Sequence, residues 1–105
     1  MLRGYALLFT FDDTGRVTNR YLIGDDLLLP DLPVWLRDYP TYRGIDLEAG
    51  VWHSMIPITD EVIIYEVKPG PYTPAADKDF ATWAPVEGTP EAAEYMKRLM
   101  SGAER

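Results

Sequence analysis

The chain has no cysteine and a single histidine, and these two scarcities limit its chemistry first. Without cysteine there is no disulfide, no thiolate metal site and no cysteine nucleophile. His53 alone cannot build a metal centre, because a metal held by protein usually needs at least three donors. Any partners of His53 must therefore be carboxylates, waters or groups outside this stretch of chain.

Basic residues and long apolar runs are also scarce. The chain has ten Lys and Arg residues and 17 Asp and Glu residues, which gives a formal net charge of -7. A negative net charge repels the phosphate backbone of nucleic acids, and the sequence contains no cluster of Lys and Arg that would offset it locally. We therefore expect no nucleic-acid partner. No apolar run approaches the ~20 residues of a membrane span, and Met1-Leu2-Arg3 leads straight into a strand pattern. We therefore expect no membrane association and a cytoplasmic location.

What the chain does have is apolar material for one small domain. It has 105 residues, 47% of them hydrophobic, with three Trp, seven Tyr and three Phe. The stretch "YALLFTF" (5–11) puts Tyr5, Leu7, Phe9 and Phe11 on one face, and this period-2 spacing with aromatic enrichment predicts a strand. "DDTG" (12–15) predicts a turn with Gly15 at positive φ, and 16–24 is the returning strand of a hairpin.

The middle of the chain predicts further strands around an irregular crossover. Residues 25–40 contain three prolines, so we expect a crossover with a short edge strand at 27–29, whose Trp35 covers apolar surface or meets a partner chain. Segments 42–50 and 51–58 alternate like half-buried strands, and the second places Val51, His53 and Met55 on one face. Residues 62–68 are apolar on both faces until Glu66, which predicts the most central strand.

The end of the chain predicts a covering loop and a helix. The loop 69–88 carries the aromatic anchors Tyr72, Phe80 and Trp83. Residues 89–102 predict the helix, with Thr89 as N-cap, Pro90 at its first position and Gly102 as its stop. Its docking stripe is Ala92, Tyr95, Met96, Leu99 and Met100. We expect one mainly β domain, an antiparallel sandwich or small barrel over 1–88 with the helix of 89–105 packed on it.

Several motifs resemble those of the WbuC family of cupin-fold metalloproteins. The string 65–85 contains Glu66-Val67-Lys68, Gly70-Pro71-Tyr72, Asp77-Lys78-Asp79-Phe80 and Trp83-Ala84-Pro85 in order, and "AGVWHS" and "LRGYALLFTFDDTGRV" are also similar. The resemblance covers roughly the whole chain and is weakest over 25–41. It implies a cupin-like jelly roll, here a partial barrel, with a divalent metal (Zn, Fe, Mn or Ni) and a link to surface-polysaccharide biosynthesis. It implies no definite reaction, so whether the protein is an enzyme stays open.

The family's metal-ligand pattern is incomplete in this chain. Gly50-x2-His53 resembles the core of the second cupin motif, with Glu48 in place of Pro and Pro57 in place of Asn, and Gly4 resembles the closing glycine of the first. The two His and the Glu of the first motif would fall before Met1. Three explanations stay open: a misplaced start or trimmed chain, a naturally shortened relative, or two chains that complete one barrel.

Each candidate residue has a structural alternative. His53 is either a metal ligand or a core or rim histidine that donates to a backbone carbonyl. Glu66 is either a second donor or an ion-pair partner of Lys68 or of an arginine. Tyr65, Tyr72, Lys78 and Trp83 are candidate ligand-binding residues, but Tyr72 and Trp83 also suit anchors that pin the loop to the barrel, and we favour that interpretation. The catalytic residues are unknown.

Two functions follow. The first is a WbuC-type cupin that binds a small sugar or carboxylate near His53, with a divalent metal bound weakly or not at all, and that is completed by dimerisation. The second is a metal-free, non-enzymatic homodimeric interaction module, whose open sheet edge is covered by a second copy. Trp35, Tyr39 and Tyr42 are candidates for a dimer interface or a pocket rim, and packing on the protein's own surface is the equal alternative.

Overall fold

The computed structural model describes residues 3–25, 32, 34–68 and 80–101. The elements in chain order are β1 (Tyr5–Phe11), β2 (Val17–Gly24), the 3-10 helix η1 (Val34–Leu36), β3 (Thr41–Tyr42), β4 (Trp52–Pro57) and α2 (Pro90–Met100). The strands form one sheet of order β3-β2-β1-β4. Strand β1 is antiparallel to β2 and β4, whereas β3 is parallel to β2, so the sheet is mixed and not wholly antiparallel as expected. No helix in the described ranges is long and apolar enough to cross a membrane.

The predicted hairpin is confirmed as β1 and β2. Tyr5 lies opposite Gly24, and a bulge after Thr10 leaves Thr18 without a residue directly opposite it. In the turn, the Asp12 carboxylate accepts hydrogen bonds from the backbone N–H groups of Thr14 and Arg16 at 2.9 and 3.0 Å. The Thr14 hydroxyl donates a third bond at 2.7 Å and is the largest cause of a lowered pKa at Asp12.

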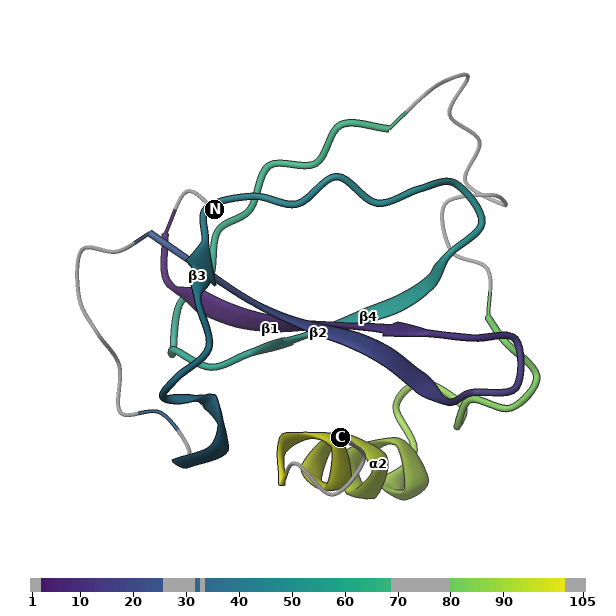
Figure 1. Ribbon diagram of the computed structural model, residues 1–105. Coiled ribbons are helices and arrows are strands. Elements are labelled where there is room, and N and C mark those ends of the chain that lie inside the picture. The colour runs from purple at the N-terminus through teal and green to yellow at the C-terminus, as the bar shows by residue number, and fades with distance from the viewer. Residues whose placement is uncertain (1–2, 26–31, 33, 69–79, 102–105) are drawn as a thin grey trace.

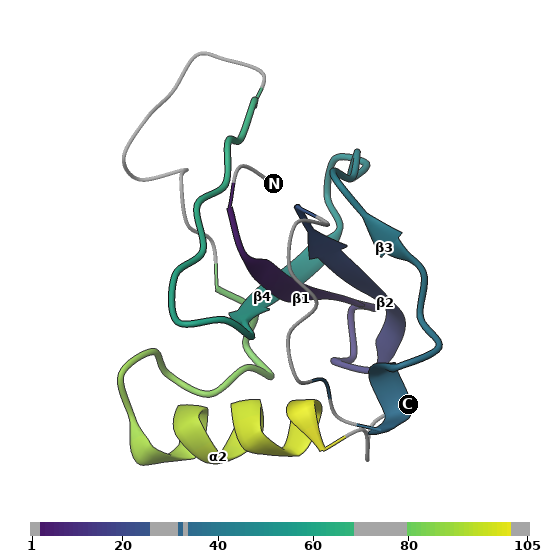
Figure 2. The same ribbon diagram turned by 90° about the vertical axis from the view of Figure 1, so that its left-hand side faces the viewer.

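Strand β1 is the centre of the molecule, because all seven of its residues are buried. It has a partner strand on each edge and cover on each face. Figure 1 shows α2 beneath one face of the sheet and the segments 43–51 and 60–68 beyond the other face. The turned view in Figure 2 shows the same arrangement. The core on the helix side consists of Leu7, Phe9, Phe11, Leu36, Ile56 and Leu99.

Two predicted strands are wrong. Residues 43–50 contain no strand, since β3 ends at Tyr42 after two residue pairs with β2. Residues 62–68 are not the central strand, because they contribute a single antiparallel bridge between Arg3 and Ile63. Alternating apolar residues predict an extended chain, but a strand also needs a neighbouring edge with matching hydrogen-bonding groups. The predicted strand 27–29 and the loop 69–79 lie outside the described residues.

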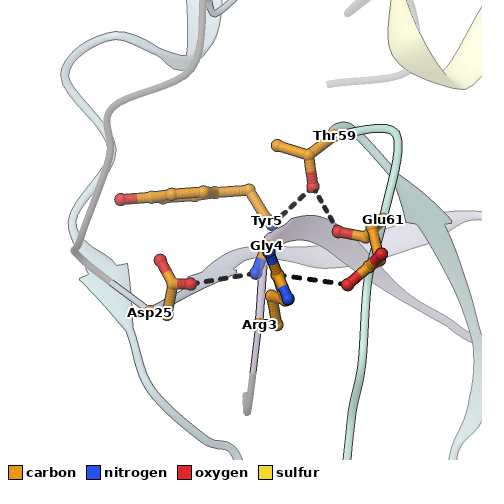
Figure 3. Close-up of polar contacts among 6 residues, drawn as sticks. All are labelled: Arg3, Gly4, Tyr5, Asp25, Thr59 and Glu61. Atoms are coloured by element: carbon orange, nitrogen blue, oxygen red, sulfur yellow. Dashed lines mark hydrogen bonds and ion pairs between the residues drawn. The ribbon is translucent and has the colours of Figure 1, made fainter.

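The start of β1 holds the chain that follows β4, as Figure 3 shows. The Tyr5 N–H donates to the Thr59 hydroxyl at 3.0 Å, and that hydroxyl donates to the Glu61 carbonyl at 2.9 Å. The Gly4 N–H donates to the Asp25 carboxylate at 3.0 Å. Gly4 has a φ of 85°, and a Cβ there would lie only 2.1 Å from the Glu61 carbonyl oxygen. Only glycine allows this approach of two backbones.

The predicted helix is confirmed as α2. The Thr89 hydroxyl accepts from the Ala92 N–H at 3.2 Å, and Pro90 begins the helix. Leu99 is buried in the core, but Met96 is 41% exposed, so the predicted docking stripe is wrong at that position.

The crossover covers apolar surface, as one of its two readings predicted. Leu36 of η1 is fully buried. The Trp35 indole N–H donates to the Met100 carbonyl at 2.9 Å, and the Trp35 ring meets Tyr39 edge to face at 5.7 Å. This segment therefore closes the C-terminal end of α2 against the sheet.

Candidate functional site

His53 lies on β4, directly opposite Thr10 of β1, so both side chains project from the sheet face turned away from α2. The His53 ring is exposed, and its Nδ1 atom lies 3.0 Å from the Val51 carbonyl oxygen. This arrangement matches the rim histidine bonded to a backbone carbonyl.

Glu66 also does not lie in a group of side chains that could bind a metal among the described residues. Its side chain is exposed and lies 3.8 Å from the Lys68 ammonium group, which matches the ion-pair alternative. Within the described ranges, no group of three or more His, Cys, Asp or Glu side chains could hold a metal ion. The residues placed by the structure therefore do not fit the metal centre that the resemblance implies.

A polar cleft lies on the same side of the sheet as His53. Its volume is about 370 Å³, between the sheet and the chain that leads into β4. It is lined by Thr10, Thr18, Asn19, Tyr21, Asp46, Leu47, Glu48 and Val51. Since the Val51 carbonyl holds the His53 ring, His53 stands at the border of this cleft.

The floor of the cleft depends on the hairpin bulge. The extra residue in β2 brings the Thr18 hydroxyl to 2.7 Å from the Thr10 hydroxyl. Thr10 is only 4% exposed, so its hydroxyl is held in place by packing. Each hydroxyl can donate and accept, and the Asn19 amide beside them can do both as well. Three adaptable hydrogen-bonding groups thus line the same side of this cleft.

An aromatic ring and two carboxylates complete the lining. Tyr21 is held by an edge-to-face contact with Tyr42 of β3, at 6.2 Å between ring centroids. Asp46 and Glu48 contribute acceptors from the opposite wall. Because the chain already carries a net charge of -7, this lining disfavours an anionic ligand. It suits a neutral ligand with several hydroxyl groups that donate to carboxylates.

Trp83 lies at the hairpin turn and not in this cleft. Its ring packs 5.1 Å from Phe11 and 6.4 Å from Trp52, measured between centroids. This placement matches the loop anchor. Phe80 was predicted to be another anchor, which is wrong, because it is 62% exposed.

A second hollow, of about 540 Å³, lies between the loop 83–85 and α2. Its charged groups, Glu91, Glu94 and Arg98, all belong to one helix and are exposed. They do not converge from several elements, as the groups of a specific ligand site usually do. We therefore favour the cleft on the sheet.

The remaining predicted ligand residues do not meet in one described site. Tyr65 is 78% exposed and does not line the cleft, and Tyr72 and Lys78 lie outside the described residues. The residues that do line the cleft were missed by reasoning from motifs. The available signal was the polar row of the half-buried segment, where Asp46 and Glu48 alternate with Ile45 and Leu47.

Comparisons of the chain with protein-family models, with curated proteins and with solved structures find no match.

Proposed function

We propose that this chain is part of a cupin-like jelly roll of the WbuC type that binds a small neutral polyhydroxylated ligand, such as a sugar, in the cleft beside His53. One observation supports the proposal above the others: hydroxyl, amide and carboxylate groups from β1, β2 and residues 46–48 converge on one cavity of about 370 Å³. The placement of chain on the sheet face opposite α2 supports a barrel interior at this position (Figure 1).

The lining also favours a sugar over a carboxylate as the ligand. Sugar hydroxyls donate to Asp46 and Glu48 and exchange hydrogen bonds with Asn19 and the threonine hydroxyls. Tyr21 offers an apolar ring face for the C–H side of a sugar. A carboxylate ligand would meet two like charges. The proposal gives no role to a metal, because the described donors form no ligand cluster.

The test is a titration of the protein with neutral monosaccharides and with small carboxylates, followed by NMR chemical shifts. We expect shifts at Asn19 and at 46–48 with the sugars only. Asn19→Ala should weaken binding by roughly tenfold, the effect of one lost hydrogen bond. The matched control is Ser54→Ala on β4, whose side chain projects from the opposite sheet face and should leave the affinity unchanged.

Two results would contradict the proposal. One is the absence of shifts with every neutral sugar tested, and the other is equal loss of affinity in Asn19→Ala and Ser54→Ala. Elemental analysis of protein purified without a His tag tests the metal separately. Near-stoichiometric metal that disappears in His53→Ala would restore the metalloprotein reading.

A second candidate function is the metal-free homodimeric interaction module, and a different observation favours it. Among the described residues, 62–68 pair through the Arg3–Ile63 bridge alone, and their odd-numbered side chains are apolar and exposed. Sizing at about twice 11.9 kDa, in the absence of bound metal, is the expected result for this function.

A further inference from the structure

Residues 61–68, here called the edge segment, expose an apolar row on an open backbone. Ile63, Tyr65 and Val67 are 44%, 78% and 83% exposed. These residues alternate, so in an extended chain they share one face. The segment runs as an extended trace on the side of the sheet away from α2 (Figure 1).

Among the described residues, the edge segment pairs with another stretch of backbone at Ile63. The Ile63 N–H and carbonyl bond with Arg3 at 2.9 and 3.1 Å, and residues 64–67 form no backbone hydrogen bond with any other described residue. In an extended chain the groups of 62, 64 and 66 point to the edge opposite Arg3. An open apolar edge of this kind is a template for another strand.

We propose that the edge segment pairs antiparallel with the edge segment of a second copy, about a two-fold axis at Tyr65. This assignment rests on the second candidate function and names its interface. Pairing about this axis sets Ile63 opposite Val67 of the copy and Tyr65 opposite Tyr65. Each apolar side chain of the row therefore lies opposite an apolar side chain of the same row in the other copy. It also sets residues 64 and 66 opposite each other, with their backbone groups facing the partner.

The charges of the segment favour a second copy in this orientation. Asp60 stands before one end and Lys68 at the other, so antiparallel pairing brings the acidic start of each copy diagonal to the basic end of its partner. The two Glu66 side chains lie diagonal to each other, but each has Lys68 of its own chain at 3.8 Å. A parallel arrangement would instead align like charges.

The expected dimer is weak. A single strand pair with three apolar side chains buries on the order of a few hundred Å² per copy, below the ~800 Å² of a standard interface. We therefore expect a dissociation constant in the micromolar range. Sedimentation equilibrium from about 5 to about 500 µM should show the mass rising from 11.9 kDa toward twice that value.

A lysine substitution tests the location of the interface. Val67→Lys should shift the dissociation constant upward at least tenfold, because a charge enters the apolar row. The matched control is Val34→Lys, since Val34 is 75% exposed and lies on η1. If both substitutions weakened the dimer equally, or if neither weakened it, the proposed interface would be overturned, while the homodimer itself would stand. A monomer at every concentration would overturn both the interface and the interaction module.

Cysteine cross-linking tests the position of the two-fold axis. Because the chain has no cysteine of its own, any disulfide must form through the introduced residues. Residues opposite each other at a non-hydrogen-bonded position lie ~4.5 Å apart at Cα, within disulfide reach. Tyr65→Cys should therefore form a covalent dimer on mild oxidation, whereas Val67→Cys alone should not. A mixture of Ile63→Cys and Val67→Cys should form the mixed dimer. Cross-linking through Val67→Cys alone, or equally through the control Val34→Cys, would overturn the proposed axis.

Discussion

Gly15→Ala tests how the hairpin turn and the covering loop are joined. Gly15 has a φ of 94°, which costs a residue with a Cβ about 1–2 kcal/mol. A Cβ at Gly15 would also lie 2.8 Å from the Cδ2 and Cε3 atoms of Trp83. The indole must move, and it is packed against Phe11 and Trp52, so overpacking adds about 1–3 kcal/mol. We expect a total loss of about 2–5 kcal/mol.

A second glycine separates the two causes. Gly88 has a φ of 81°, but nothing lies within 4 Å of a Cβ built there. Gly88→Ala should therefore show the backbone cost of about 1–2 kcal/mol alone. In a Trp83→Leu background, Gly15→Ala should fall to the same cost, which gives a coupling energy of about 1–3 kcal/mol.

The assay is urea unfolding followed by far-UV circular dichroism. With a slope of about 1–3 kcal/mol per molar urea, a loss of 3 kcal/mol lowers the midpoint by roughly 1–3 M. Equal losses in Gly15→Ala and Gly88→Ala would refute the reasoning. So would a double-mutant cycle without coupling, because the Trp83 ring would then not lie over the turn.

Three further predictions concern the helix and the turn. Leu99→Ala, at a buried position, should lower the free energy of unfolding by about 2–5 kcal/mol, whereas Met96→Ala should cost less than about 1 kcal/mol; similar losses would contradict the docking of α2. Thr89→Ala should remove the N-cap bond and cost about 1 kcal/mol in urea unfolding, and no loss would contradict the cap. The pKa of Asp12 is lowered from 3.8, so its stabilising effect is present above pH 3.8 and is lost as the pH falls below it. The stability difference between the wild type and Asp12→Ala should therefore be constant near neutral pH and shrink below pH 3.8; a constant difference at all pH values would refute the lowered pKa.

The site was predicted less well than the fold. The sequence placed His53 on one strand face with Val51 and Met55 and offered the rim histidine as one interpretation, which the bond to the Val51 carbonyl matches. It did not indicate that Thr18 joins Thr10, because that contact depends on a bulge whose position no local pattern reveals. The cleft residues also come from segments far apart in the chain, and spacing along the sequence carries no information about such contacts.

The local elements follow from local chemistry. The period-2 spacing of large apolar side chains in 5–11, the "DDTG" turn and the cap at Thr89 each determine the conformation of neighbouring residues, so the hairpin and α2 were both predictable. Edge pairing is different. Residues 62–68 have the composition of a central strand, yet only the tertiary structure decides which chain lies beside them, and there β1 occupies the centre with a partner on each side. Alternation is a property of one segment, whereas a hydrogen-bonded edge is a property of two, and the second is selected by the packing of the whole chain.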